Sequence, residues 1–166
     1  MQNRKIKLVP YNPKWPQIFQ KEAGPIQQAL GSNCVALHHF GSTSIPGLCA
    51  KPKIDILAVV HKLDAIDVPA LEKLGFEARG EVIPSGKYFS KKSPHVHLHI
   101  FEEGNPLIEK DLNFRDYLRT HEEDLKNYAS LKAHLAALHE DGMSYSLAKT
   151  EFIDQILAKC NAEKHL

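Results

Sequence analysis

The chain has 166 residues, 43% of them hydrophobic, which suits one compact domain with a single core. Its formal net charge of +1 gives no reason to expect non-specific binding to nucleic acid or to an anionic membrane. No apolar run approaches the roughly 20 residues that span a bilayer, and the amino-terminal stretch MQNRKIKLVPYNPKW lacks the apolar core of a secretory signal. We therefore expect a single domain over residues 1–166 in a cytoplasmic protein.

The cysteines agree with that compartment. Cys34, Cys49 and Cys160 are odd in number and form no C-x-x-C pair. This pattern favours buried, reduced thiols over disulfides, with a cysteine nucleophile as the alternative.

The amino-terminal part predicts a short strand, KIKLVP, followed by a long helix that runs to about Leu30. Asn12 suits the N-cap and Pro13 the first helical position, and apolar residues then recur at roughly helical spacing. Pro25, which follows Gly24, should kink or split this helix because its nitrogen cannot donate to the carbonyl four residues back.

Three β-rich runs come next along the chain. CVALHHF (34–40) and PKIDILAVV (52–60) are predicted strands, and VPALEKLGF (68–76) suits a short helix. HVHLHIF (95–101) alternates strictly, so it should be a strand whose one face carries His95, His97, His99 and Phe101. We expect these three strands to lie side by side in one sheet.

From about Pro106 the pattern becomes helical and predicts helices over 107–119, 121–139 and 144–160. Residues 120–123 fit a capping box for the second of them, and the Asp-Gly pair at 141–142 fits its end. Strands followed by helices predict an α/β or α+β fold, a mixed sheet flanked by helices with a helical carboxy-terminal part.

The stretch Gly41-Ser42-Thr43-Ser44, after the first of the three strands, is a candidate phosphate site. Its backbone N–H groups and hydroxyls can surround one anion, and Gly41 permits close approach. It matches neither a P-loop nor a nucleophile elbow, and the alternative is an ordinary serine-rich loop. As a phosphate site it predicts that Gly41→Val abolishes nucleotide affinity at little cost in melting temperature.

Asp55 interrupts a run that should be buried, where a bare carboxylate is costly. One interpretation is an ion pair with Lys51, Lys53 or an arginine, and Asp55→Asn would then cost roughly 3–5 kcal/mol. The other is a divalent ion held between the carboxylate and a nucleotide, in which case Asp55→Asn leaves stability unchanged or improved.

Three histidines on one strand face are a second candidate for metal binding. Alternate strand residues lie about 6.5–7 Å apart, so two imidazoles of the His95/His97/His99 ladder could reach one ion or phosphate. Imidazoles in place of acids favour Mn²⁺ or Zn²⁺ over Mg²⁺. The alternative is a solvated strand face.

Four basic residues of the helical part could neutralise a triphosphate: Arg115, Arg119, Lys132 and Lys149. The alternative is a solvated face, or pairs with Asp111, Asp116 or Glu122.

HHFGSTSIPGLCAKPKIDIL closely resembles the core signature of the GrpB family, GSTS-[VI]-PGL-x-AKP-x-ID. Further matches are VPYNPKW, HLHIFE, FRDYLRTHEEDLKNYASLKAHLA and YSLAKTEFIDQIL, so the resemblance covers most of the chain. GrpB-like domains also occur fused behind dephospho-coenzyme A kinases, and the family is grouped with the nucleotidyltransferases. The resemblance therefore implies a nucleotidyltransferase-like fold.

That superfamily's motif is a Gly-Ser turn, then an Asp-x-Asp/Glu pair on a strand, then a third acid on a neighbouring strand. Gly41, Ser42 and Asp55 match, but Leu57 stands at the second acid and histidines replace the third. His38 stands where the family usually has a glutamate. Two-metal transfer relies on carboxylates, so these departures support the fold more than the reaction.

The resemblance implies, first, an enzyme of nucleotidyltransferase type that binds a nucleoside triphosphate. Asp55, His97 and His99 would be its catalytic and metal residues, with Mg²⁺ or Mn²⁺ expected ahead of Zn²⁺. The phosphates would contact the turn and neighbouring cations: Gly41, Ser42, Thr43, Ser44, Lys51, Arg115, Arg119, Lys132 and Lys149.

Two other functions remain open at this point. One is a nucleotide- or metabolite-binding module that kept the fold and lost transfer, as the missing second acid suggests. The other is a hydrolase with Zn²⁺ or Mn²⁺ on the histidine ladder and Asp55. The sequence does not specify the base, the acceptor or the oligomeric state.

Overall fold

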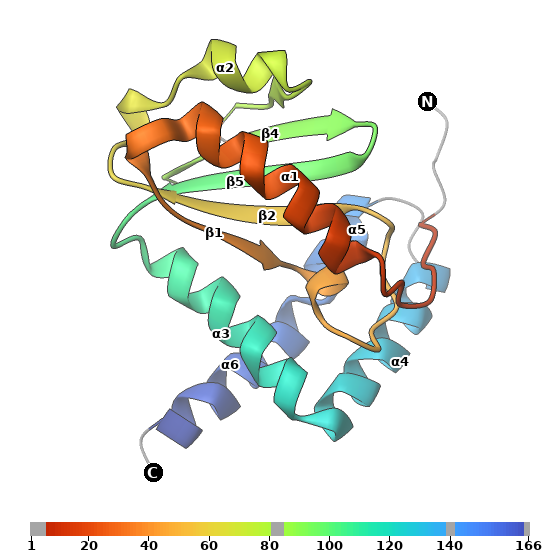
Figure 1. The fold of residues 1–166 in the computed structure, drawn as a ribbon. Coiled ribbons are helices and arrows are strands. Elements are labelled where there is room, and N and C mark those ends of the chain that lie inside the picture. Colours follow the sequence, from red (N-terminus) through yellow and green to blue (C-terminus); the bar gives the residue numbers. More distant parts are fainter. Residues whose placement is uncertain (1–5, 81–84, 139–141, 165–166) are drawn as a thin grey trace.

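The computed structural model describes residues 6–80, 85–138 and 142–164, which form a five-stranded sheet with helices on both faces (Figure 1). The strands are β1 (Cys34–Phe40), β2 (Ile54–Val60), β3 (Glu77–Ala78), β4 (Gly86–Lys92) and β5 (His95–Glu102). The helices are α1 (Trp15–Leu30), α2 (Val68–Lys73), α3 (Pro106–Thr120), α4 (Glu122–Leu138), α5 (Gly142–Ala148) and α6 (Thr150–Lys164). Within these ranges no helix has both the length and the apolar character needed to cross a bilayer.

The sheet is mixed, as the sequence predicts. Its strand order is β1-β2-β5-β4-β3, so the three strands expected side by side are neighbours. β2 and β5 pair in parallel, and the other pairs are antiparallel. The parallel register sets Asp55 opposite His97 and Leu57 opposite His99.

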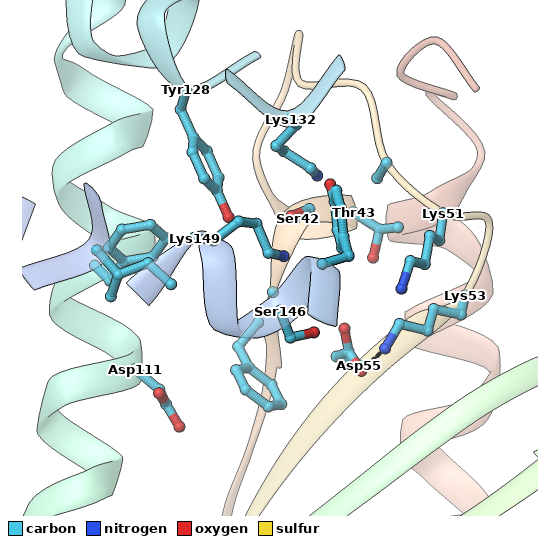
Figure 2. A pocket seen from close by; sticks show the side chains of 16 residues that line it. Ser42, Thr43, Lys51, Lys53, Asp55, Asp111, Tyr128, Lys132, Ser146 and Lys149 are labelled. Carbon is cyan, nitrogen blue, oxygen red and sulfur yellow. Dashed lines mark ion pairs between the residues drawn. The ribbon is translucent and has the colours of Figure 1, made fainter. Parts of the chain in front are cut away.

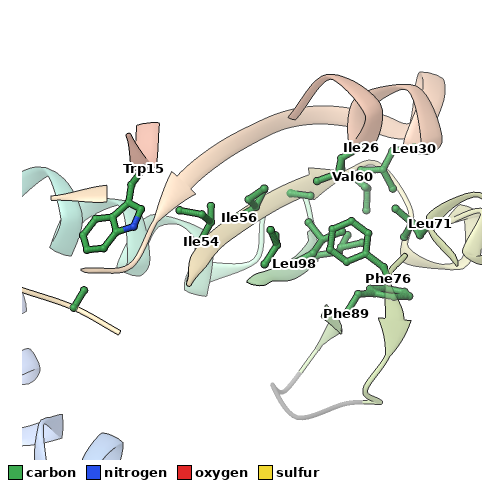
Figure 3. Close-up of a cluster of buried hydrophobic side chains, with 14 residues drawn as sticks. Trp15, Ile26, Leu30, Ile54, Ile56, Val60, Leu71, Phe76, Phe89 and Leu98 are labelled. Atoms are coloured by element: carbon green, nitrogen blue, oxygen red, sulfur yellow. The ribbon is translucent and has the colours of Figure 1, made fainter. Parts of the chain in front are cut away.

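The larger hydrophobic core lies between one face of the sheet and helices α1 and α2 (Figure 3). Val96, Leu98 and Ile100 of β5 point into it, together with alternate residues of β2. The expected division of β5 is therefore confirmed, and the histidines lie on the opposite face. That face packs against α3 through a smaller cluster centred on Leu57, Val59 and Phe101.

The amino-terminal expectations need three corrections. KIKLVP contributes only an isolated bridge between Val9 and Ala50, with Lys5 outside the described residues. The helix starts at Trp15, with Lys14 in place of Asn12 at its N-cap, and the Asn12 side chain accepts a hydrogen bond from the Lys14 N–H at 2.9 Å in the turn before the helix. It then continues through Pro25 to Leu30, since the helix packs on the sheet through its buried face and tolerates one missing hydrogen bond.

The carboxy-terminal part agrees with the expected helices except at Lys149. The single helix expected over 144–160 is two helices, α5 and α6, with Lys149 between them. The Thr120 hydroxyl lies 3.1 Å from the Tyr117 carbonyl, within α3, so it is engaged in the preceding turn and not in the expected capping box. Residue 139, the expected helix end, and Asp141 lie outside the described residues.

All three cysteines are free. Cys160 is buried in the helical part, while Cys34 and Cys49 are half-buried. Cys160 therefore agrees with the expected buried thiol, whereas Cys34 and Cys49 are more exposed than expected.

We predict that Ile56→Ala, in the fully buried centre of β2, destabilises the protein by about 2–5 kcal/mol because it leaves a cavity in the core. Urea unfolding measures the loss. Val35→Ala on the neighbouring strand is the matched control, since Val35 is 45% exposed and should change stability by no more than about 0.5 kcal/mol. Equal losses in the two variants would contradict the core described here.

Candidate functional site

A cavity of about 210 Å³ opens on the histidine-bearing face of the sheet, where the GSTS turn meets the carboxy-terminal helices (Figure 2). One wall comes from the turn, the following loop and β2, and includes Gly41, Ser42, Thr43, Lys51, Lys53 and Asp55. The other wall comes from the helical part and includes Asp111, Tyr128, Lys132, Tyr145, Ser146 and Lys149. Seven of the residues proposed from sequence thus share one cavity.

The GSTS segment forms a short 3-10 turn over Ser42–Ser44 that begins from a left-handed Gly41, with φ of 72°. Gly41 lies so close to β2 that a β-carbon there would stand 2.5 Å from Oδ2 of Asp55. Ser42 bonds Tyr128 across the cavity, while Thr43 bonds the His39 ring at 3.0 Å. Ser44 donates back to the Gly41 carbonyl and faces away from this cavity.

Asp55 combines both interpretations raised by its sequence. Its carboxylate Oδ1 lies 3.7 Å from Lys53 Nζ, 3.9 Å from His97 Nδ1 and 3.8 Å from His99 Nε2. Burial alone would raise the pKa of this carboxyl, but Lys53 and the His99 and His97 rings lower it to about 2. Asp55 is therefore ionised at neutral pH and has an ion-pair partner as well as two imidazole neighbours.

Asp55, His97 and His99 could hold one metal ion, because their ligand atoms all lie within 4.8 Å of one another. Burial and then Lys53 lower the pKa of His97 to about 4, which keeps its ring in the neutral form that binds metals. Nδ1 of His99 is buried without a hydrogen-bond partner among the described residues. Two imidazoles and a carboxylate suit Mn²⁺ or Zn²⁺ better than Mg²⁺, which prefers oxygen ligands.

His95 does not join this group. It is exposed, and its Nε2 lies 2.9 Å from Nε2 of His97, on the side of that ring away from Asp55. The Tyr88 hydroxyl lies 2.7 Å from Nδ1 of His97. The ladder thus places two of its three histidines beside the carboxylate.

Lysines surround the rest of the cavity. Lys132 is 2% exposed, and its ammonium donates to the Cys49 carbonyl at 2.7 Å. Burial, followed by repulsion from Lys149, lowers the pKa of Lys132 to about 7. Burial, followed by repulsion from Lys51 and Lys53, likewise lowers the pKa of Lys149 to about 8. The lysines that line the cavity outnumber its two carboxylates, Asp55 and Asp111, so their positive charge is not fully balanced.

Asp111 is a second acid of the cavity that the sequence indicated only as an ion-pair partner. It comes from α3, and burial raises the pKa of its carboxyl to about 6 although His99 and Lys110 oppose this. Asp111 and Phe114 both line the cavity. They are three residues apart and so share one face of α3, and this spacing is the sequence feature that could have indicated Asp111. Tyr128, Tyr145 and Ser146 carried no comparable signal.

Arg115 and Arg119 lie outside this cavity, on the other side of the turn. They line a separate cavity of about 320 Å³ with His38 and His39. Arg115 donates to the His39 carbonyl at 2.9 Å, and Arg119 donates twice to the Ser44 carbonyl, at 3.0 and 2.8 Å. Both arginines therefore hydrogen-bond to backbone carbonyls in the turn or next to it, on the side away from the first cavity.

Comparison with known proteins decides the family. The model of the family described as "GrpB protein" matches residues 5–159. The chain belongs to the GrpB family. Its relatives include UPF0157 protein YqkA of Bacillus subtilis, 41% identical over 90% of this chain and 46% of that protein. UPF0157 protein BH1888 of Halalkalibacterium halodurans is 40% identical over 96% of this chain and 85% of that protein.

The fold is also that of a solved GrpB structure. The crystal structure of conserved protein GrpB from Enterococcus faecalis superimposes with a TM-score of 0.87 at 32% identity, covering 96% of this chain and all of that one. A shorter stretch of 65 residues is 37% identical to a dephospho-CoA kinase of Mycolicibacterium paratuberculosis, over 37% of this chain and 16% of the kinase. The chain spans less than half of YqkA, so the activity of such longer proteins does not transfer directly.

We predict that Gly41→Ala costs about 1–3 kcal/mol, because alanine is strained at this positive φ and its β-carbon would displace Asp55. This replaces the expectation that a side chain at Gly41 leaves the melting temperature almost unchanged. Gly24→Ala in α1 is the control: nothing lies within 4 Å of its β-carbon, and it should gain up to about 1 kcal/mol. Thermal unfolding of the two variants compares them directly, and a neutral Gly41→Ala would refute the close approach.

Proposed function

We propose that this GrpB protein binds a nucleoside triphosphate with a divalent metal ion in the cavity beside the GSTS turn, and that it is an enzyme of nucleotidyltransferase type. One observation carries the proposal: Asp55, the carboxylate of the group that it forms with His97 and His99, lines the same cavity as a lysine cluster and a tight glycine turn. Such a combination suits an anion with several phosphates and its accompanying cation.

Each part of the cavity has a role in this proposal. Asp55, His97 and His99 would hold the ion, which supplies charge neutralisation and alignment of the phosphates when bound. Ser42 and Thr43 would orient phosphate oxygens through hydroxyls and backbone N–H groups. Lys51, Lys132 and Lys149 would balance the charge that develops on the departing pyrophosphate.

Asp111 is the candidate general base for the acceptor. Its carboxyl lines the cavity, and a pKa of about 6 leaves it mostly ionised at neutral pH yet able to accept a proton. The acceptor would be a hydroxyl or similar group whose proton passes to a carboxylate oxygen of Asp111 while its oxygen attacks the α-phosphorus. Pyrophosphate is the leaving group in that step.

A second candidate function is nucleotide binding without transfer. Leu57, at the position of the second acid, is completely buried against Val59 and Phe101, so β2 offers only one carboxylate to the cavity. Calorimetry with nucleoside triphosphates and Mg²⁺ or Mn²⁺, followed by a pyrophosphate-release assay, separates the two functions. Binding without turnover would favour the second, and metal-dependent phosphatase activity without nucleotide binding would favour a hydrolase.

We predict that Asp55→Asn abolishes the stabilisation of the protein by Mn²⁺. Without metal, the substitution should lower the free energy of unfolding by about 2 kcal/mol, a value that follows from the lowered pKa of this carboxyl. The cost arises because the folded protein favours the ionised form beside Lys53, so we expect a loss of stability in place of the unchanged stability that the metal interpretation alone predicts. The contribution is present above about pH 4, the range of the unfolded carboxyl, and disappears as the pH falls through about 2.

Melting curves with and without Mn²⁺ test this, with Asp64→Asn as control because Asp64 is exposed and lies outside the cavity. The control should keep both its stability and its metal response. A wild-type protein whose melting temperature does not respond to Mg²⁺, Mn²⁺ or Zn²⁺ would contradict the metal site.

A further inference from the structure

The cavity gathers ammonium groups from separate parts of the chain. Lys51 and Lys53 precede β2, Lys132 comes from α4, and Lys149 lies between α5 and α6 (Figure 2). Among the described lining residues only Asp55 and Asp111 are acidic, and Asp55 already pairs with Lys53. Since uncompensated charge is costly in a buried place, this excess calls for a ligand with several negative charges.

Lysines cover the two tyrosine rings of the cavity, while its Phe40 and Phe114 rings contact His99 and Tyr128 edge-on. Lys51 and Lys149 stand over the ring of Tyr145, with their Nζ atoms 4.9 and 4.5 Å from its centre. Lys132 stands over Tyr128 at 5.5 Å. Ammonium groups therefore cover ring faces on which a nucleotide base would otherwise stack.

The size of the cavity also favours phosphate groups over a whole nucleotide as the enclosed ligand. Its volume of about 210 Å³ is below the roughly 300–1,000 Å³ of pockets that enclose a drug-sized ligand. Besides the lysines and the two carboxylates, its walls carry hydroxyls of Ser42, Thr43, Ser146, Tyr128 and Tyr145, which suit phosphate oxygens. The enclosed space thus fits phosphate groups, and the sugar and base of a nucleotide would project from the opening.

We propose that the cavity recognises a chain of condensed phosphates, so that the number of phosphate groups sets the affinity and the base is not read. Inorganic triphosphate is then a ligand in its own right, equal to a nucleoside triphosphate. This inference rests on the proposed function, because it concerns the same cavity, and it narrows the class of ligand.

Binding of such a chain should take up protons. Lys132 faces Lys149, Lys51 and Asp55 as well as Cys49 and Tyr128, and Lys149 faces Lys51, Lys53, Asp55 and Tyr145. With pKa values of about 7 and 8, both amines are partly neutral at pH 8. A polyanion offsets the repulsion among the lysines and favours their charged forms, so it draws protons onto Lys132 and Lys149.

Calorimetry of the full chain at pH 8, without metal, in two buffers of different ionisation enthalpy tests the inference. Inorganic triphosphate, ATP and UTP should bind within a factor of about three of one another, because discrimination requires groups that contact the part that differs. Pyrophosphate and then orthophosphate should bind more weakly. The heats for triphosphate should differ between the buffers in the direction of proton uptake.

Two results overturn the inference and leave the proposed function intact: nucleotide binding that triphosphate does not displace, or heats that show no proton uptake. Failure of every phosphate compound to bind, with and without Mn²⁺, would overturn both.

Lys132→Met should weaken triphosphate binding by about 10- to 100-fold, the usual effect of losing a charged hydrogen bond, and should reduce the proton uptake. Methionine keeps an unbranched side chain and removes a buried charge, so a melting curve should show a folded protein. Lys126→Met on the same helix is the matched control, because Lys126 is 74% exposed and pairs with Glu122.

Full affinity in a folded Lys132→Met protein would overturn the inference. If that variant does not fold, Lys149→Met, between α5 and α6, provides the same test, with the same expected loss.

Discussion

The parallel pairing of β2 with β5 determines where the acid and the imidazoles of the site lie. The register sets Asp55 opposite His97 and puts both on the sheet face that carries the cavity. A slip of one residue would turn the histidines into the larger core and expose Val96, Leu98 and Ile100. Burial of Val96, Leu98 and Ile100 therefore fixes the side of the sheet on which Asp55, His97 and His99 lie, although these apolar residues are not part of the metal-binding group. The chain between these strands supplies α2, β3 and β4. β4 and β3 extend the sheet beyond β5.

The second half of the site is attached to this sheet through backbone carbonyls. Lys132 holds the Cys49 carbonyl, Arg119 holds that of Ser44 and Arg115 that of His39. Side chains from α3 and α4 thus fix the segment that carries the GSTS turn, and the arginines act on its position without entering the cavity. The helical part both positions the turn and supplies Lys132 and Lys149 to the cavity beside it (Figure 2).

The sequence predicted those features that depend on local pattern. The alternation of HVHLHIF gave the two faces of β5, and the isolated carboxylate of Asp55 indicated a polar position within a buried strand. β4 escaped prediction because GKYFSKK carries three lysines and only a weak apolar alternation. The arginines share a helix face as expected, but which side of the turn that face meets depends on tertiary packing. Asp111 was missed for the same reason.

The segment between the turn and β2 lies at a boundary between two hydrophobic clusters. Ile45 and Leu48 pack with the carboxy-terminal helices, whereas Ala50 packs with the core between the sheet and α1. These clusters share no buried residue, so the segment links two separate apolar cores. Cys49, whose carbonyl Lys132 holds, stands at the junction. A ligand held between the turn and the helical layer would therefore connect two parts of the molecule that have separate cores.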